Sequence, residues 1–321
     1  MKRVLLGVAG LLALGVAACG GGSTPAPDAP KTLRFAVIPK SLDLPVFNYA
    51  KIGAERAAAE IGNIEIIWRA PETADQLRQK EILESFITQK VDGIAISALN
   101  GDFLTDTINR AVDAGIPVVT WDSDAPKSKR QAFYGVDDFR SGQIMAEEAV
   151  KLLGGKGTIA ILTSLGATNL QRRLDGVKDV FAKNPGMSIV ETYDIKEDPV
   201  RVPEIIQTAA QRYPTLSAWI SVGGWPVFTR NALASINPEK TKFISFDTIS
   251  PALDLLRENK VQVLLGQKYF GWGAEPVKIL NNLIKGIQPP SAIIDSGVDV
   301  VTMGTVDAYQ KVWTSMESGG K

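Results

Sequence analysis

From Leu33 to Thr302 the sequence alternates short apolar runs with longer segments of helical periodicity. The first run, Leu33–Ile38, is followed by a segment up to Ile61 in which apolar residues recur every three or four positions. Strands that alternate with helices in this way build βαβ units, whose helices cover the faces of a parallel sheet. The alternation therefore predicts an α/β fold made of doubly wound parallel sheets.

The alternation restarts midway along the chain, which indicates two domains. A chain of 321 residues also exceeds the roughly 250–300 residues at which a single hydrophobic core stops growing. We expect strands at 33–38, 64–68, 94–97, 117–121, 158–163, 188–193, 218–222, 242–246, 261–265 and 298–302. We expect helices at 47–61, 141–153, 170–181, 203–212, 227–236, 251–258 and 273–285, one capped by Asp75, and one that begins at Asp102 and ends at Gly115.

The composition argues against several classes of function. Lys plus Arg and Asp plus Glu are balanced at 35 each, so no basic field favours a nucleic acid. Because the chain has no histidine and one cysteine, it offers no Ser-His-Asp or Cys-His pair, no imidazole metal site and no cysteine-bound zinc. We therefore expect a binding protein without catalytic residues, metal, cofactor or nucleic-acid partner.

The N-terminus resembles the signal of a bacterial lipoprotein. Lys2 and Arg3 precede an apolar run that is too short to span a bilayer. The run ends in Val16-Ala17-Ala18-Cys19, which is similar to a lipobox and implies lipidation of Cys19; the alternative is an ordinary secretory signal with an incidental cysteine. Residues 1–18 are then the signal peptide and residues 19–30, rich in Gly and Pro, a flexible tether. The protein is expected to be exported, to be periplasmic or at the outer face of the cytoplasmic membrane, and to be lipid-anchored at Cys19, with a mature charge of about −2.

Polar and aromatic residues follow the expected strands. In a doubly wound sheet, ligands bind outside the carboxyl ends of the strands. The residues at these positions are Lys40, Trp121-Asp122-Ser123-Asp124, Thr163-Ser164, Gly223-Gly224-Trp225, Asp247 and Gln267. Such side chains suit a ligand that is rich in hydroxyl groups and has apolar ring faces.

From about Thr32 to Trp313 the order of motifs resembles the periplasmic sugar-binding proteins of ABC importers, the family that includes the ribose-binding protein. The motifs are Pro45-Val46-Phe47, Val91-Asp92-Gly93-Ile94, Ala114-Gly115-Ile116-Pro117-Val118-Val119, Asp122-Ser123-Asp124, Gly135-Val136-Asp137-Asp138, Phe246-Asp247 and Gly266-Gln267. The resemblance implies a type I periplasmic binding protein fold, in which two lobes close over one sugar and present it to a membrane permease. The implied lobes are 31–134 with 268–297, and 135–267 with 298–321, joined by crossings near 132–137, 265–267 and 296–298.

The resemblance also implies site residues. Phe47 matches a ring-stacking aromatic, although it also suits the core of its helix. Asp122 and Asp247 match sugar-binding aspartates, and a carboxylate makes strong charge-assisted hydrogen bonds with hydroxyl groups; the alternative for Asp122 is a loop-capping role. Gln267 matches a hinge glutamine. Arg173 matches an arginine that reaches ring and hydroxyl oxygens, with Arg172 as the competing register.

Departures from the ribose-binding pattern affect the expected ligand. Leu44 replaces one family asparagine, and Gly223 replaces another, with Trp225 nearby as a substitute platform. Lys40 is absent from the ribose pattern and, with Thr120-Trp121-Asp122-Ser123-Asp124, resembles the branch of rhamnose and autoinducer receptors, although Asn169 stands where autoinducer receptors have an aspartate. The resemblance therefore favours a hexose, deoxysugar or polyol over ribose.

Three points remain open at this stage. Ser123 is a further ligand-binding candidate, and Asp124 either shares that role or holds the loop. Trp68, Trp219 and Trp272 either face the cleft or pack in the core.

The sequence also bears on alternative functions. A chemoreceptor role is an alternative to transport. A sugar-modifying enzyme is disfavoured because the sequence shows no nucleophile–base pair, and a repressor of the lactose-repressor type is disfavoured because the sequence shows no DNA-binding segment. We expect the protein to be a monomer.

Overall fold

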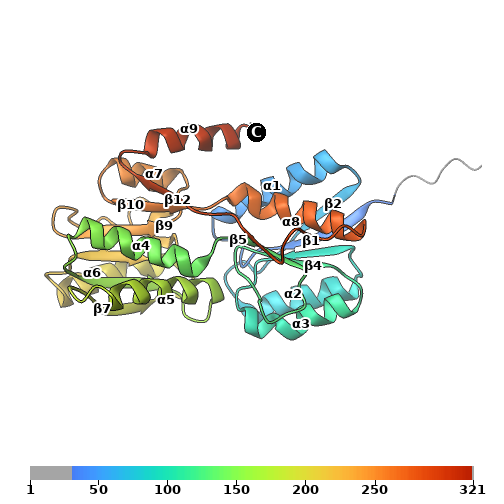
Figure 1. Cartoon of the computed structure of the whole chain (residues 1–321), viewed down its shortest axis with the longest axis horizontal. Coiled ribbons are helices and arrows are strands. Elements are labelled where there is room, and N and C mark those ends of the chain that lie inside the picture. Colours follow the sequence, from blue (N-terminus) through green and yellow to red (C-terminus); the bar gives the residue numbers. More distant parts are fainter. Residues whose placement is uncertain (1–30, 320–321) are drawn as a thin grey trace, which may run out of the picture. The chain divides into compact units, whose positions relative to one another are not determined.

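The computed structural model describes residues 31–319, which carry two six-stranded sheets with helices packed against them (Figure 1). The predicted signal peptide 1–18, the tether 19–30 and the proposed lipidation site Cys19 lie outside the described residues. No helix within the described range is long and apolar enough to cross a membrane.

The first sheet has the strand order β11-β5-β4-β3-β1-β2, and all of its neighbouring strands are parallel. Its strands are β1 (Leu33–Ile38), β2 (Ile64–Trp68), β3 (Gly93–Ile96), β4 (Val118–Trp121), β5 (Ala132–Gly135) and β11 (Ile293–Asp295). The helices that pack on it are α1 (Val46–Ile61), α2 (Gln76–Thr88), α3 (Gly101–Asp113) and α8 (Tyr269–Ile284).

Strand β1 shows how the first sheet acquires two apolar faces. Successive side chains of a strand point to opposite faces. Phe35 and Val37 belong to the core under α1 and α8, whereas Ala36 and Ile38 belong to the core under α2 and α3. Figure 1 shows these helix pairs on opposite faces of the sheet. The continuous apolar run in the sequence therefore reflects burial on both sides, as is typical of a parallel sheet.

The second sheet has the order β12-β10-β9-β8-β6-β7. Its strands are β6 (Gly157–Thr163), β7 (Met187–Asp194), β8 (Ala218–Ser221), β9 (Lys242–Phe246), β10 (Val263–Gly266) and β12 (Asp299–Thr302). Its helices are α4 (Asp138–Leu152), α5 (Thr168–Ala182), α6 (Val202–Arg212), α7 (Ser250–Arg257) and α9 (Val306–Glu317), with the 3₁₀ turns η1 (Pro199–Arg201) and η2 (Trp225–Val227). The two sheets confirm the predicted doubly wound α/β class.

The chain passes between the two sheets three times: between β5 and α4, between β10 and α8, and between β11 and β12. The last passage makes β12 antiparallel to β10, whereas the sequence predicted parallel strands throughout. The reason is that β11, which is parallel to β5, leaves the first sheet at the carboxyl ends of its strands, and residues 296–298 lead directly into β12, which therefore enters the second sheet at the carboxyl ends of its strands and runs against them.

The C-terminal helix α9 follows the second sheet but also contacts a helix of the first. Arg56 of α1 donates hydrogen bonds to the carbonyl oxygens of Met316 and Glu317, at 2.6 and 2.8 Å. The rings of Tyr49 and Trp313 pack edge to face with their centroids 4.9 Å apart. Helix α9 therefore connects elements that belong to different sheets.

The helix boundaries confirm some sequence predictions and correct others. Asp75 caps α2 by accepting hydrogen bonds from the backbone N–H groups of Leu77 and Arg78, as predicted. The cap of α3 is Asn100, whose side chain accepts a hydrogen bond from the Phe103 N–H. Asp102 lies in the first turn of α3 instead of at its beginning, because Asn100 already supplies the capping oxygen.

Four elements differ from the sequence prediction. The prediction of a helix at 227–236 is wrong, because the chain forms η2 and then successive turns. In two of these turns the N–H of Ala234 donates to the carbonyl of Asn231, and the N–H of Ile236 donates to the carbonyl of Leu233. Polar residues within that segment favour turns over a helix interior. Helix α9 was not expected, although Val306, Tyr309 and Trp313 recur at helical spacing. Strands β5 and β11 were not expected because each has only three or four residues.

Close packing of α1 against α8 depends on glycine. A Cβ atom on Gly273 of α8 would overlap the carbonyl oxygen of Ala50 in α1, and one on Gly53 would overlap that of Phe270. The two helix backbones therefore approach more closely than any larger residue at these positions would allow.

We predict that Gly273→Ala lowers the free energy of unfolding by about 1–3 kcal/mol, because the added methyl group must push two helices apart. Guanidinium denaturation followed by tryptophan fluorescence measures the change. Gly304→Ala is the matched control, since its Cβ would meet only Thr302 Oγ1 at 3.9 Å. Equal effects of the two substitutions would contradict the proposed close contact.

Candidate functional site

Side chains from both sheets line one cavity of about 40 Å³, enough for a few water molecules. Most of them follow strands β1, β4, β7, β8, β9 and β10 or lie near the beginnings of α1, α5 and α8. The lining residues are Lys40, Leu44, Val46, Phe47, Asp122, Asn169, Leu170, Arg173, Glu197, Gly223, Gly224, Trp225, Phe228, Asp247, Gln267 and Trp272. The cavity thus lies where the carboxyl ends of strands from both sheets meet, as expected for this class of sheet.

Asp122 and Asp247 occupy equivalent positions after β4 and β9. Both are buried, and both have a positive φ, 57° and 74° respectively, a conformation that aspartate adopts more readily than most residues. Asp122 Oδ2 accepts a hydrogen bond from Ser97 Oγ at 2.7 Å. Asp247 Oδ1 accepts hydrogen bonds from Gln267 Nε2 at 3.0 Å and from the Tyr269 hydroxyl at 2.9 Å. One oxygen of each carboxylate is therefore fixed by the protein.

Arg173 makes three hydrogen bonds with residues around the cavity. Its Nε donates to Asp138 Oδ1 at 2.8 Å, its Nη1 to the Val222 carbonyl at 3.0 Å and its Nη2 to Gln267 Oε1 at 3.1 Å. The guanidinium also lies over the Phe246 ring, 3.8 Å from its centroid, which favours a cation. Arg172 is exposed, so Arg173 is the arginine that faces the cavity.

Burial changes the acidity of two carboxyl groups here. Desolvation raises the pKa of Asp138 to about 7, opposed by Arg173, and raises the pKa of Asp247 to about 6, opposed by hydrogen bonding to Gln267. Both shifts follow from the cost of placing a charge away from water.

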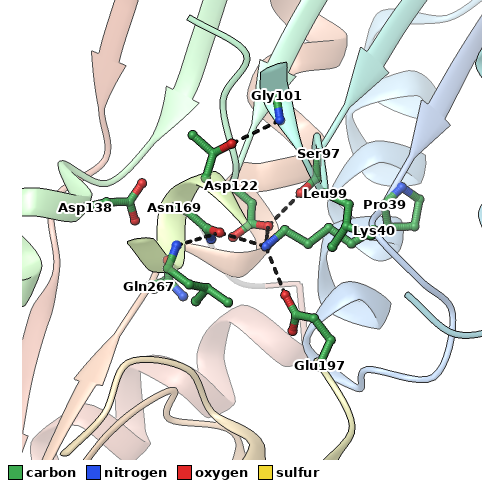
Figure 2. A network of polar contacts seen from close by, with 12 residues as sticks. Pro39, Lys40, Ser97, Leu99, Gly101, Asp122, Asp138, Asn169, Glu197 and Gln267 are labelled. Atoms are coloured by element: carbon green, nitrogen blue, oxygen red, sulfur yellow. Dashed lines mark hydrogen bonds and ion pairs between the residues drawn. The ribbon is translucent and has the colours of Figure 1, made fainter. Parts of the chain in front are cut away.

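Lys40 follows β1 of the first sheet, and its side chain contacts residues that belong to the second sheet's side of the molecule, in α5 and after β7 (Figure 2). Its Nζ lies 2.9 Å from Asn169 Oδ1, 3.5 Å from Glu197 Oε1 and 3.9 Å from Asp122 Oδ2. A second hydrogen bond between elements of the two sheets, from the Gly101 N–H to Thr168 Oγ1, measures 3.0 Å. Polar contacts therefore join the two sides of the cavity.

Aromatic rings form the apolar part of the wall. Phe47 lines the cavity and also packs edge to face on Trp121 at 5.8 Å and beside Trp272 at 6.1 Å, so it belongs to the core of its helix, and its stacking on a ligand ring stays a prediction. Trp225 donates its indole N–H to Glu197 Oε2 at 2.9 Å. A Cβ at Gly223 would collide with the Trp225 ring, which explains why that position holds glycine.

Two expected site residues, Ser123 and Asp124, lie outside the cavity. Asp124 receives hydrogen bonds from Arg130 Nε and Nη2, both at 2.7 Å, and from the Thr120 hydroxyl at 2.6 Å. Ser123 is buried without contributing to the lining. Asp124 therefore holds the loop, the second of the two roles considered for it, because Arg130 draws its carboxylate away from the cavity.

The structure brings in residues that the sequence did not single out, above all Glu197. It follows β7 by three positions, so the rule that placed the other candidates after strands also applies to it. It was missed because Lys196-Glu197-Asp198 has the composition of an exposed turn. Of the three open tryptophans, Trp272 lines the cavity, whereas Trp68 packs near Trp121 and Trp219 near Tyr193. Within residues 31–319, no three His, Cys, Asp or Glu side chains are grouped as a metal site would require.

Comparisons with known proteins agree with this geometry. Residues 35–288 match the family described as periplasmic binding protein domain. A solute-binding protein of an ABC transporter from Burkholderia graminis, solved in complex with D-arabinose, is 32% identical with a TM-score of 0.82, and the match covers 87% of this chain and 98% of that one. A xylitol-binding protein of Mycolicibacterium smegmatis is 29% identical over 60% of this chain and 55% of its own length, and a ribose import binding protein of Bacillus subtilis is 24% identical over 74% and 77%.

The match over most of the chain defines the class: a two-lobed solute-binding protein of the kind that serves ABC transporters, and not an enzyme. The chain belongs to the periplasmic binding protein family. The fold implied by the sequence resemblance is thereby confirmed.

We predict that the stability of the protein relative to Asp247→Asn falls as the pH rises from about 4 to about 6, by up to about 3 kcal/mol. The pKa of Asp247 is raised to about 6 in the folded state, so over this window the folded protein holds a proton that the unfolded chain has released. Urea denaturation at pH 4, 5, 6 and 7 measures the difference. A flat difference for Asp247→Asn would contradict the assignment.

Proposed function

We propose that the protein captures a monosaccharide or a related polyol between its two lobes and delivers it to the permease of an ABC importer. The observation that carries the proposal is the pairing of Asp122 and Asp247 across a cavity that also has aromatic walls. Carboxylates accept hydrogen bonds from hydroxyl groups, and aromatic rings pack against the apolar faces of a sugar ring.

Free hydrogen-bonding atoms support a polyhydroxylated ligand. The bonds described above engage Asp122 Oδ2 and Asp247 Oδ1, which leaves Asp122 Oδ1 and Asp247 Oδ2 as acceptors. Within residues 31–319 the buried Trp272 Nε1 has no hydrogen-bond partner, although it lines the cavity. Asn169 uses its Oδ1 for Lys40 and Leu170, so its amide hydrogens are donors. Hydroxyl groups, which both donate and accept, suit this mixture.

Domain movement is part of the proposal. A monosaccharide requires more room than the cavity of about 40 Å³ offers, so binding requires the walls to move apart. The three passages between the sheets are the places where such a movement would be absorbed, and lobes 31–134 with 268–297 and 135–267 with 298–321 would move as units. A ligand that contacts both lobes then favours the closed form.

The relatives support the same ligand class. Ribose, D-arabinose and xylitol are named for similar proteins, and all three are small molecules with several hydroxyl groups. The chain spans 55% of the length of the xylitol-binding protein. The protein would act as a monomer on the outer side of the cytoplasmic membrane, without a cofactor.

We predict that at least one neutral sugar or polyol raises the melting temperature of the purified protein. Ligand at about 100 times its Kd stabilises the native state by about 2.7 kcal/mol, which corresponds to a shift of about 4–5 °C for a chain of this size. A fluorescence thermal-shift screen of pentoses, hexoses, deoxysugars and polyols makes the measurement. If none of these compounds produced a shift, the proposed function would be wrong.

We predict that Asp122→Ala and Asp247→Ala each weaken the binding of that ligand at least about 100-fold, because each removes a charge-assisted hydrogen bond from a desolvated site. Titration calorimetry measures the affinity. Asp124→Asn is the matched control: it alters a neighbouring carboxylate that faces Arg130, so it should leave affinity unchanged. Equal losses in all three variants would show a general effect on folding instead.

The lipid anchor gives a separate prediction. If Cys19 is lipidated, Cys19→Ala should release the protein from the membrane fraction, since a thioether-linked lipid can no longer form. Fractionation of the expressing bacterium, with palmitate labelling of both forms, tests this. Label and membrane association that persist in Cys19→Ala would refute the anchor while leaving the ligand site unaffected.

A further inference from the structure

The charges that line the ligand cavity do not balance. Among the described residues of its lining, three carry carboxylates and two carry cations: Asp122, Glu197 and Asp247, against Lys40 and Arg173. Arg173 also pairs at 2.8 Å with the carboxylate of Asp138, which lies beside the cavity without lining it. All of these carboxylates are buried. The site therefore holds an excess of negative charge that bulk water does not compensate.

Glu197 presents a buried acceptor to the cavity. Its Oε2 accepts a hydrogen bond from the Trp225 indole N–H at 2.9 Å, but its Oε1 has no hydrogen-bond partner within residues 31–319. Lys40 Nζ lies 3.5 Å from Oε1 and donates its hydrogen bond to the neutral Asn169 side chain instead, at 2.9 Å. A buried charged oxygen without a donor is costly, so Oε1 is an acceptor for which the ligand can supply the donor.

The other carboxylates around the cavity repel one another. Desolvation raises the pKa of Asp247 to about 6, and the charge of Asp122 contributes to the rise. The same two effects raise the pKa of Asp138. Like charges in a desolvated site favour a nearby cation. A metal ion does not fit this need, because no three His, Cys, Asp or Glu side chains in the described part of the chain are grouped to hold one. The compensating charge would therefore belong to the ligand.

We propose that the preferred ligand is a sugar or polyol that carries a protonated amino group, and that this ammonium donates a hydrogen bond to Glu197 Oε1. The inference rests on the proposed function and deepens it by naming the charge of the ligand. A carboxylate offers about four lone-pair sites, so Oε1 can accept from the ligand while Lys40 stays beside it. The ligand charge offsets the excess of carboxylates, whereas an acidic sugar would add to that excess.

Ligands that differ in the charge of one substituent test the inference on the natural protein. Titration calorimetry at pH 7 compares glucosamine with glucose, N-acetylglucosamine and glucuronate, galactosamine with the corresponding galactose compounds, and glucamine with sorbitol. In at least one series the amine should bind at least about tenfold tighter than its neutral parent, and the acid should bind more weakly than that parent. Amines that bind no tighter than their neutral parents in every series would overturn the inference.

Substitutions of Glu197 test its contact with the ammonium. The measured quantity is the affinity for the amine divided by the affinity for its neutral parent. Glu197→Gln removes the charge and keeps the shape, so this ratio should fall at least about fivefold, whereas Glu197→Asp keeps the charge and should give an intermediate ratio. Asp106→Asn is the matched control: it removes the same charge from an exposed side chain, where water and salt screen it, so the ratio should not change. An unchanged ratio in Glu197→Gln would overturn the assignment, and if that variant did not fold, an unchanged ratio in Glu197→Ala would do so.

The outcomes separate this inference from the proposed function. Binding of neutral sugars or polyols without any preference for their amines would support the proposed function and overturn the inference. Binding of both kinds, with the amines tighter, would support both. Propylamine, which has the ammonium but no hydroxyl groups, should not raise the melting temperature. A protein that responded to propylamine and to none of the sugars or polyols would refute the proposed function.

Discussion

The cost of burying carboxylates determines how this site is built. Asp122, Asp138, Glu197 and Asp247 are all buried, and such charges are tolerated only when cations and hydrogen-bond donors compensate them. Arg173 donates hydrogen bonds to Asp138 and to Gln267, and Gln267 in turn donates one to Asp247. Lys40 forms ion pairs with Glu197 and Asp122. Each cation thus holds in place a group on a different element, and the walls of the cavity depend on these pairs.

The repeated architecture explains why the carboxylates face one another. The strand order β2-β1-β3-β4-β5 of the first sheet matches β7-β6-β8-β9-β10 of the second. Asp122 follows β4 and Asp247 follows β9, and both have left-handed backbone conformations. Two sheets built on the same plan, with their carboxyl ends directed at one cavity, present the same chemical group from both sides. The halves differ at other positions, such as Lys40 and Glu197.

The sequence predicted the class of fold because the alternation of strands and helices is repeated many times, so errors in single elements do not change it. It predicted nine of the cavity residues from their places after strands or from the resemblance. They are Lys40, Phe47, Asp122, Asn169, Arg173, Gly223, Trp225, Asp247 and Gln267. It left the role of Asp124 open, because only the position of Arg130 decides whether that carboxylate faces the cavity. The sequence did not predict Glu197, because the burial of this charged turn after β7 depends on its contact with Lys40, which follows a strand of the first sheet.

Helix α9 has a consequence for how the protein can move. It belongs by sequence to the second sheet, yet Arg56 of α1 binds its last carbonyl groups and Tyr49 packs on Trp313. A rotation that separated Lys40 from Glu197 would have to carry these contacts along or break them. Helix α9 thus forms a fourth connection between the lobes, made by side chains instead of by the continuous backbone.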